Sequence, residues 1–378
     1  MASTIIRFGD YTITTPALVV FLVGASLFSF GGMAAVILFR ECKSEVPVSP
    51  LRKRFVQNFI MVYSVGLLLL VPAFLLALRR VSGSLGLEEF AVATRIAFGE
   101  SDRGGIPRYF VSLTSVGTVL AYCAAWIYGG ERRDKFVIWL AVLGPLLMNV
   151  LTFGRTPIYV LITGVIAIML FRGVIGVRNV LLCVVLGLLL FVTMGILLGK
   201  GPEFGSTKST LSAVVENLAL YFVGGPVSFG YIMYHPASVG ESGLSLRFFT
   251  QAISSLGGNI SLPDIVTGYF SDVLGNVYTI YFAYWLDWGW LGVSVMSLVA
   301  GFFCTSIYIR ARKRYPIAGV AMGMVVPAIL NSATVDLLFF SSIPWLLIVV
   351  VVYLLWNVPI PVFFASRSMF QNVDSHGK

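Results

Sequence analysis

The stretch Gly289–Arg314 constrains the fold more than any other part of the sequence. Its first part, Gly289–Tyr308, is an uncharged and largely apolar run of about 20 residues, long enough to cross a bilayer as an α-helix. Basic residues follow within 310–314, and a basic cluster at one end of a spanning helix marks the cytoplasmic side. We therefore expect the polar and aromatic run before it, 276–288, at the outer side of the membrane.

The composition places the whole chain in the same class. Of its 378 residues, 58% are hydrophobic and only 11% are charged, which leaves too little polar surface for a soluble domain. Backbone polar groups inside a bilayer must bond to one another, so spanning segments are helices or closed barrels. The apolar runs of this chain are long and do not alternate with polar residues, which favours helices. The sequence thus predicts an all-α, polytopic membrane protein with a single membrane domain over residues 1–378.

Apolar runs separated by basic loops predict the topology. The positive-inside rule assigns the loops containing Arg52–Arg54, Arg132–Lys135 and Arg310–Arg314 to the cytoplasm. The N-terminus is then periplasmic and the C-terminal tail cytoplasmic, and we expect about nine to eleven transmembrane helices. The clearest spans are Pro16–Phe39, Gln57–Leu78, Pro107–Tyr128, Phe136–Phe153, Pro157–Phe171, Asn179–Leu198, Gly289–Tyr308, Ile317–Val335 and Ser342–Pro359.

The stretch Gly201–Leu274 is the longest part of the chain without a clear span. Its most apolar part, Leu211–Tyr234, contains Glu216 and is interrupted by two glycines and Pro226. Either the stretch is one long periplasmic loop that covers the membrane surface as a lid, or it crosses twice, with the second crossing near Ile265–Leu286. The first alternative gives the lower number of spans and the second gives the higher one.

Arginines on the outer side are the first candidates for a binding site. Arg155 lies in a very short turn between two apolar spans, and Arg247 is far from other cations in the sequence. A planar guanidinium group makes two parallel charged hydrogen bonds, which suits a diphosphate. The alternative is that such side chains reach out to lipid phosphates, and we favour this for Arg79 and Arg103.

Aromatic and acidic residues crowd the same side. The density of aromatic residues from Tyr278 to Trp290 exceeds what membrane anchoring needs, so a subset is expected to face a sugar ring. Asp264, Asp272 and Asp287 are placed to bond a hydroxyl group, and one of them could act as a general base. On a helix, a polar stripe would hold Asn276, Thr279, Ala283 and Asp287.

Motifs for metals, nucleotides and hydrolytic nucleophiles are absent from the sequence. No Cys/His cluster has metal-ligand spacing, no Gly-rich phosphate loop follows a strand, and no nucleophile elbow occurs. We therefore expect neither a metal nor a cofactor.

Three short motifs carry a family resemblance. Phe153–Pro157 looks like a Gly-Arg-Thr/Ser turn that opens a spanning helix, and Arg247 with Gly258 matches an Arg-x10-Gly pattern of outer loops. The segments 276–279 and 287–292 look like an Asn-Val-Tyr-Thr … Asp-Phe-Gly-x-x-Gly signature, with Trp288 in place of Phe. With its many helices and one long late outer loop, the chain resembles bacterial O-antigen polymerases of the Wzy type, within the oligosaccharide repeat-unit polymerases.

The resemblance implies a glycosyltransferase with a GT-C-like scaffold at the periplasmic face of a bacterial inner membrane. Its donor would be a growing glycan on undecaprenyl pyrophosphate, and its acceptor would be a hydroxyl group of one lipid-linked repeat unit. The expected partners are these lipid-linked oligosaccharides, membrane lipids and a chain-length regulator protein, with no nucleic acid. The implied catalytic residues are Arg155, Arg247 and Asp287. The implied substrate-binding residues are Arg80, Asn276, Tyr278, Trp288, Asp272 and His235.

Two other functions stay open. O-antigen ligases share a similar scaffold and arginine turn, but they carry a His-Asn pair where this chain has Gly275 and Asn276, which argues against a ligase. A lipid-linked oligosaccharide flippase would need an alternating cavity and would break no bond. Release of undecaprenyl pyrophosphate therefore separates a polymerase from a flippase.

Overall fold

The structure is a computed structural model in which the chain divides into two compact units. The first unit comprises Met1–Cys42, Lys200–Arg310 and Met324–Ile343, and the second comprises Lys43–Gly199, Ala311–Gly323 and Pro344–Lys378. A single membrane domain over the whole chain stays a prediction. The residues that the structure describes are 4–8, 11–40, 49–82, 106–152, 155–176, 178–181, 185, 187, 224–234, 243–246, 249–250, 253, 279–332, 336–338 and 342–359.

Helices make up nearly all of the described residues, in agreement with the predicted class. Five of the described helices are long and apolar enough to cross a membrane, so the chain has the build of a multi-pass membrane protein. Every predicted span overlaps a described helix except Asn179–Leu198, which lies largely outside the described residues. The five long helices are α1 (Thr15–Phe39), α2 (Pro50–Ser82), α4 (Ile106–Ile127), α5 (Arg132–Leu151) and α10 (Phe282–Arg312). Shorter apolar helices are α6 (Arg155–Phe171), α11 (Pro316–Leu330) and α12 (Ser342–Asn357).

A β-hairpin before α1 departs from the all-α prediction. Its strands β1 (Thr4–Phe8) and β2 (Tyr11–Thr14) pair antiparallel, with Phe8 opposite Tyr11. The hairpin was not predicted, because the period-two pattern of such short strands is a weak signal. β2 continues directly into α1, whose first turn contains Pro16, where a missing backbone N–H leaves no bond unmade.

Glycines let α1 and α10 approach until their backbones touch in the first unit. A Cβ atom at Gly31 of α1 would collide with the carbonyl group of Leu298. A Cβ atom at Gly301 of α10 would collide with the carbonyl group of Phe28. Small residues are typical of helix contacts in membranes, where close packing replaces the hydrophobic effect as the main attraction.

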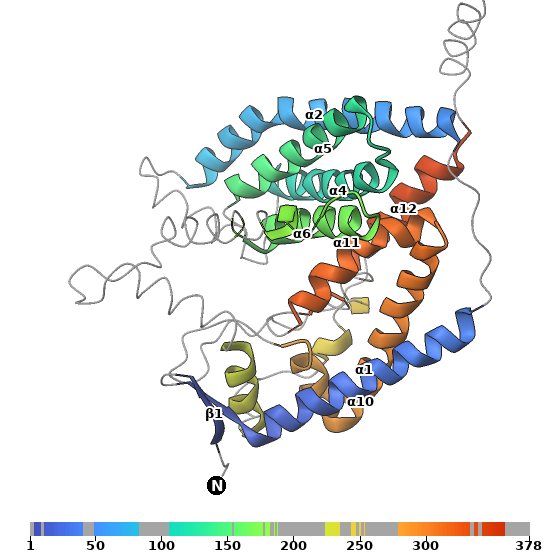
Figure 1. The fold of residues 1–378 in the computed structure, drawn as a ribbon. Coiled ribbons are helices and arrows are strands. Elements are labelled where there is room, and N and C mark those ends of the chain that lie inside the picture. The colour runs from blue at the N-terminus through green and yellow to red at the C-terminus, as the bar shows by residue number, and fades with distance from the viewer. Residues whose placement is uncertain are drawn as a thin grey trace, which may run out of the picture. The chain divides into compact units, whose positions relative to one another are not determined.

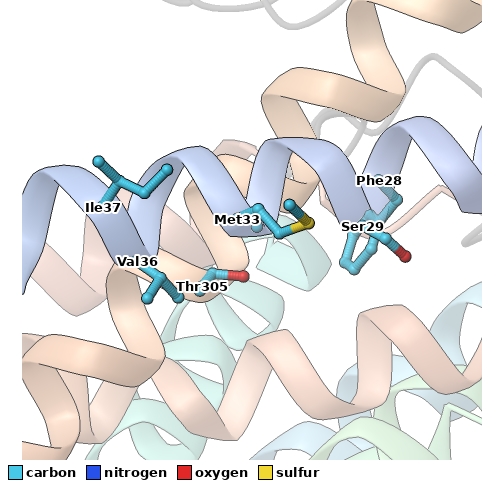
Figure 2. Close-up of a pocket in the computed structure, with 7 residues that line it drawn as sticks. Phe28, Ser29, Met33, Val36, Ile37 and Thr305 are labelled. Carbon is cyan, nitrogen blue, oxygen red and sulfur yellow. The ribbon is translucent and has the colours of Figure 1, made fainter.

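An apolar hollow with a volume of about 470 Å³ lies beside this crossing (Figure 2). It contains no ionisable side chain, so it offers no acid, base or charge for chemistry. Its wall consists of Phe28, Ser29, Gly32, Met33, Val36, Ile37 and Thr305.

Helix 224–234 packs against the first parts of α1 and α10 and completes the core of the first unit. Phe229 and Ile232 of this helix and Val20 of α1 are completely buried. Trp285 of α10 meets Phe229 edge-on, with ring centres 6.1 Å apart. This core positions the start of α10, where much of the sequence signature lies.

In the second unit, α2, α5 and α6 all pack on α4, and α2 and α6 also pack on α5 (Figure 1). Tyr122 of α4 is fully buried, and its hydroxyl donates a hydrogen bond of 2.7 Å to the carbonyl of Val160 in α6. Its ring lies against Gly164 of α6 and Gly323 of α11, where a Cβ atom would collide with it. One aromatic side chain thus joins three helices.

Basic residues that we predicted to face the cytoplasm gather at one end of the second unit. Lys53, near the start of α2, forms ion pairs with Glu131 at 3.2 Å and with Asp134 at 3.0 Å. Arg52 donates a hydrogen bond of 2.6 Å to the carbonyl of Val358, directly after α12. The starts of α2 and α5 therefore lie at the same end as the end of α12, which agrees with loops that share one side of a membrane.

Candidate functional site

α10 is broken at Gly289, inside the segment 287–292 of the sequence signature. Gly289 has φ 56° and ψ −136°, a backbone conformation that essentially only glycine adopts without strain. α10 consists of two helices that meet at Gly289, so its longer part begins at the glycine where we predicted the spanning helix to begin. The short helix before the break was not among the predicted spans, and it packs through Phe282 and Ala283, which are core residues.

The second glycine of the signature has a different role. A Cβ atom at Gly292 would collide with the carbonyl of Tyr284, so the break folds the two parts of α10 tightly together. Gly289 therefore adopts the positive-φ backbone conformation of the break, and Gly292 leaves room for the carbonyl group of Tyr284. No atom lies within 4 Å of the position of an added Cβ at Gly289, so the described structure leaves the outer side of the break open.

Asp287 lies just before the break and anchors a distant part of the chain. Its Oδ1 accepts a hydrogen bond of 2.8 Å from the backbone N–H of Gly243. Its Oδ2 accepts one of 2.7 Å from the backbone N–H of Ser245 and another from the hydroxyl of the same residue. Both carboxylate oxygens are thus engaged with the 3₁₀ turn η2 (Leu244–Leu246), which Arg247 follows directly in sequence. This is the geometry of an anchoring group.

A second buried contact holds the first part of α10. Tyr284 is 2% exposed, and its hydroxyl donates a hydrogen bond of 2.5 Å to Oδ2 of Asp336. Asp336 is 7% exposed, and its Oδ1 accepts a hydrogen bond of 2.9 Å from the N–H of Leu338. The N–H of Ile280 also donates to the carbonyl of Ser332, at 2.8 Å. The connection between α11 and α12 therefore fixes the start of α10 in two places.

Asp336 was not among the residues predicted from the sequence. It is the only acidic residue between Asp287 and Asp374, and it stands at the end of the apolar run 317–335. That isolation is a signal, because an acid at a membrane span is costly unless it is bonded. No local pattern could have named its partner, since Tyr284 is 52 residues away in sequence.

The aromatic run divides into buried and exposed members. Tyr281 and Trp285 pack into the core of the first unit, so their rings stabilise the fold. Trp288 and Trp290, on either side of the break, are 49% and 45% exposed. Trp290 also meets Trp285 edge-on, with ring centres 5.3 Å apart. Among the described members of the run, these two tryptophans offer open ring faces to a lipid or a sugar.

Thr279 does not belong to the helical stripe that we expected. α10 begins at Phe282, so Thr279 lies before the helix, and only Ala283 and Asp287 of the described stripe members are helical. Thr279 is nevertheless buried, and its Oγ1 has no hydrogen-bond partner in the described part of the chain. Buried hydroxyl groups are usually bonded, so this atom is a candidate contact for a substrate or a water molecule.

The other predicted site residues are described in part or not at all. Arg155 is the first residue of α6, as expected of a turn that opens a helix, and only its backbone is described. Arg80 lies in the last turn of α2 and is exposed. The predicted residues outside the described ranges are Arg247, Asn276, Tyr278, Asp272 and His235.

Two further observations bear on the assignment of a function. Within the described residues, no group of three His, Cys, Asp or Glu side chains could hold a metal ion. Comparison with protein-family models, curated proteins and solved structures finds no match for this chain. A functional assignment therefore depends on the sequence motifs and on the geometry around Asp287.

Proposed function

We propose that this protein is a membrane glycosyltransferase that joins undecaprenyl-pyrophosphate-linked oligosaccharide repeat units into a polysaccharide of the O-antigen type. The observation that carries the proposal is the anchor at Asp287. The acid of the signature accepts hydrogen bonds from the backbone of Gly243 and Ser245, directly before Arg247 in sequence. Two motifs that resemble the polymerase family separately in sequence are thereby linked.

In the proposed reaction, a hydroxyl oxygen of the acceptor repeat unit bonds to the anomeric carbon of the donor glycan. The bond from that carbon to the pyrophosphate oxygen breaks, and undecaprenyl pyrophosphate leaves with the electron pair. The hydroxyl proton passes to a carboxylate or to water. Negative charge grows on the leaving group, and the guanidinium groups of Arg155 and Arg247 would stabilise that charge.

Asp287 would serve this reaction by positioning. A carboxylate with both oxygens engaged by Gly243 and Ser245 is suited to fixing the chain before Arg247 more than to accepting a proton. Trp288, with nearly half of its surface exposed beside the break, would offer a stacking face to a sugar ring. The remaining proposed contacts to the substrate are Arg80, Asn276, Tyr278, Asp272 and His235.

The proposal places this site at the periplasmic face of a bacterial inner membrane, with a periplasmic N-terminus and a cytoplasmic C-terminus. Support comes from the basic starts of α2 and α5, where Lys53 bonds to Asp134, because basic ends face the cytoplasm. A GT-C-like scaffold and a chain-length regulator as partner belong to the same proposal.

The decisive experiment incubates the purified full-length protein with lipid-linked repeat units and follows the products on a gel. A ladder of polymer, with release of undecaprenyl pyrophosphate, is the expected result. Transfer of glycan to lipid A core without a ladder would identify a ligase. Movement of the lipid-linked repeat across vesicle membranes with no pyrophosphate release would identify a flippase, and the proposal would then be wrong.

A further inference from the structure

Arg172 sits against an aromatic wall at the basic end of the second unit. It directly follows α6, and its guanidinium carbon lies 5.5 Å from the ring centre of Trp126 at the end of α4. Trp126 in turn stacks on Phe171, with ring centres 6.5 Å apart. The Nε–H of Arg172 is buried and has no hydrogen-bond partner in the described structure. A buried donor without an acceptor is unusual and points to a missing partner.

Arg314 contributes a second positive charge that acts on Arg172, from an exposed position and with a backbone conformation that favours glycine. It lies in the turn between α10 and α11, where its N–H donates to the carbonyl of Ala311 at 2.9 Å. Its φ is 71°, the left-handed conformation that usually ends helices with glycine. α11 is held beside Trp126, because Gly319 lies against that indole ring.

The charges around Arg172 do not balance. Burial and the positive charge of Arg314 lower the pKa of Arg172 from its ordinary value, and the negative charge of Asp134 acts in the opposite direction. Yet the Asp134 carboxylate already accepts hydrogen bonds from Lys53, at 3.0 Å, and from the backbone N–H of Gly129, at 2.6 Å. The side-chain amide of Gln57 is a third donor to it. Little acceptor capacity is left for the two arginines.

We propose that Arg172 and Arg314 form a binding site for a phosphate group, the headgroup phosphate of an anionic phospholipid or free phosphate. A phosphate oxygen would accept the Nε–H of Arg172, and its charge would offset the repulsion between the two guanidinium groups. Basic pockets between helices at the cytoplasmic end of a membrane protein suit anionic headgroups, which are abundant in that leaflet. This site is separate in its residues from the proposed glycosyl transfer and does not depend on it.

The test uses full-length protein purified in a neutral detergent. Binding of dioleoyl phosphatidylglycerol is titrated by native mass spectrometry against dioleoyl phosphatidylcholine, which has the same tails and no net charge. Arg314→Gly removes one guanidinium group and relieves the left-handed backbone, so it should fold at least as well as the parent. Arg172→Gln removes the other guanidinium group, and Arg172→Lys keeps the positive charge but lacks the planar guanidinium group. Arg312→Ala, an exposed arginine in the last turn of α10, is the matched control for loss of one charge.

The expected result is phosphatidylglycerol binding that weakens by roughly tenfold or more in Arg172→Gln and Arg314→Gly, with Arg172→Lys in between. Arg312→Ala should stay within about twofold, because Arg312, unlike Arg314, is not among the charges that act on Arg172. A separate arm titrates sodium phosphate and reads the melting temperature. If phosphate raises the melting temperature in a saturable way only when both arginines are present, and the two lipids bind equally well, the site binds free phosphate. Equal binding of both lipids and of phosphate in every variant, or an equal loss in Arg312→Ala, overturns the proposal.

Discussion

The hydroxyl of Tyr284 donates a hydrogen bond of 2.5 Å to the carboxylate of Asp336, and both side chains are buried. This bond ties the first part of α10 to the connection between α11 and α12. A buried charged acceptor that loses its donor keeps its full desolvation cost. The pair should therefore stabilise the candidate site as a unit, and its two members should be energetically coupled.

Tyr284→Phe should destabilise the protein by about 1–3 kcal/mol, since it leaves Asp336 with fewer donors. Asp336→Asn removes the charge, and the double variant should lose clearly less than the sum of the two single losses. Thermal unfolding of the four proteins in detergent measures this cycle. Strictly additive losses would show that the hydrogen bond contributes nothing of its own.

The conformation of Gly289 gives a sharp test of the break in α10. Gly289→Ala should cost about 1–3 kcal/mol, because φ 56° is strained for any residue with a side chain. Neither Gly289 nor Gly66 of α2 has an atom within 4 Å of the position of an added Cβ. Gly66→Ala is therefore the matched control, and it should be neutral or slightly stabilising as a helical substitution. Equal melting temperatures for the two variants would mean that α10 is not broken.

The variant Asp287→Asn distinguishes an anchoring role of Asp287 from a role in proton transfer. Asp287→Asn keeps one acceptor oxygen for η2 but places an amide group near the second donor, so polymer synthesis should fall by roughly tenfold or more. If Asp287 positions the chain before Arg247, the pH–rate profile of Asp287→Asn should keep the shape of the parent profile. Loss of the acidic limb would instead identify Asp287 as the general base.

The two ion pairs of Lys53, in the second unit, offer a matched pair of variants. The Glu131 side chain is 69% exposed and the Asp134 side chain is 1% exposed. Glu131→Gln should change stability by about 0–1 kcal/mol, as exposed ion pairs do. Asp134→Asn should cost about 3–5 kcal/mol, because buried donors lose a charged acceptor. A larger loss for Glu131→Gln than for Asp134→Asn in thermal unfolding would contradict this assignment of burial.

The sequence predicted the helices well because apolar length is read directly from composition along the chain. The sequence did not predict helix boundaries that depend on tertiary contacts. α10 begins at Phe282 because Phe282 and Trp285 pack on α1 and helix 224–234, and no local pattern shows that packing. Gly289 was predicted as the start of the spanning helix, and it is the junction between the two helices of α10; the short helix before it was not predicted.

The site residues stay a prediction, and the contacts that the structure shows around Asp287 and Tyr284 were not predicted from the sequence. The motif singled out Asp287, but its donors at Gly243 and Ser245 lie more than 40 residues away in sequence, so no local pattern named them. Asp336 was not predicted for the same reason, because its hydrogen bond to Tyr284 joins residues that are 52 positions apart in sequence. Sequence spacing specifies neighbours within one helix, whereas these contacts depend on how separate helices meet.

The proposed pyrophosphate contacts of Arg155 and Arg247 give the most direct test of function. A charged hydrogen bond in a partly dry site contributes about 1.5–3 kcal/mol, so Arg155→Ala and Arg247→Ala should each slow polymer synthesis by roughly ten- to a hundredfold. Arg155→Lys keeps the charge but loses the planar fork, so its activity should fall between those of the parent and Arg155→Ala. Arg79→Ala, which removes an exposed arginine at the end of α2, is the control and should leave the polymer ladder unchanged. Ladders are compared at equal protein level in the membrane. Full-length polymer from both alanine variants would show that these arginines bind membrane lipids instead.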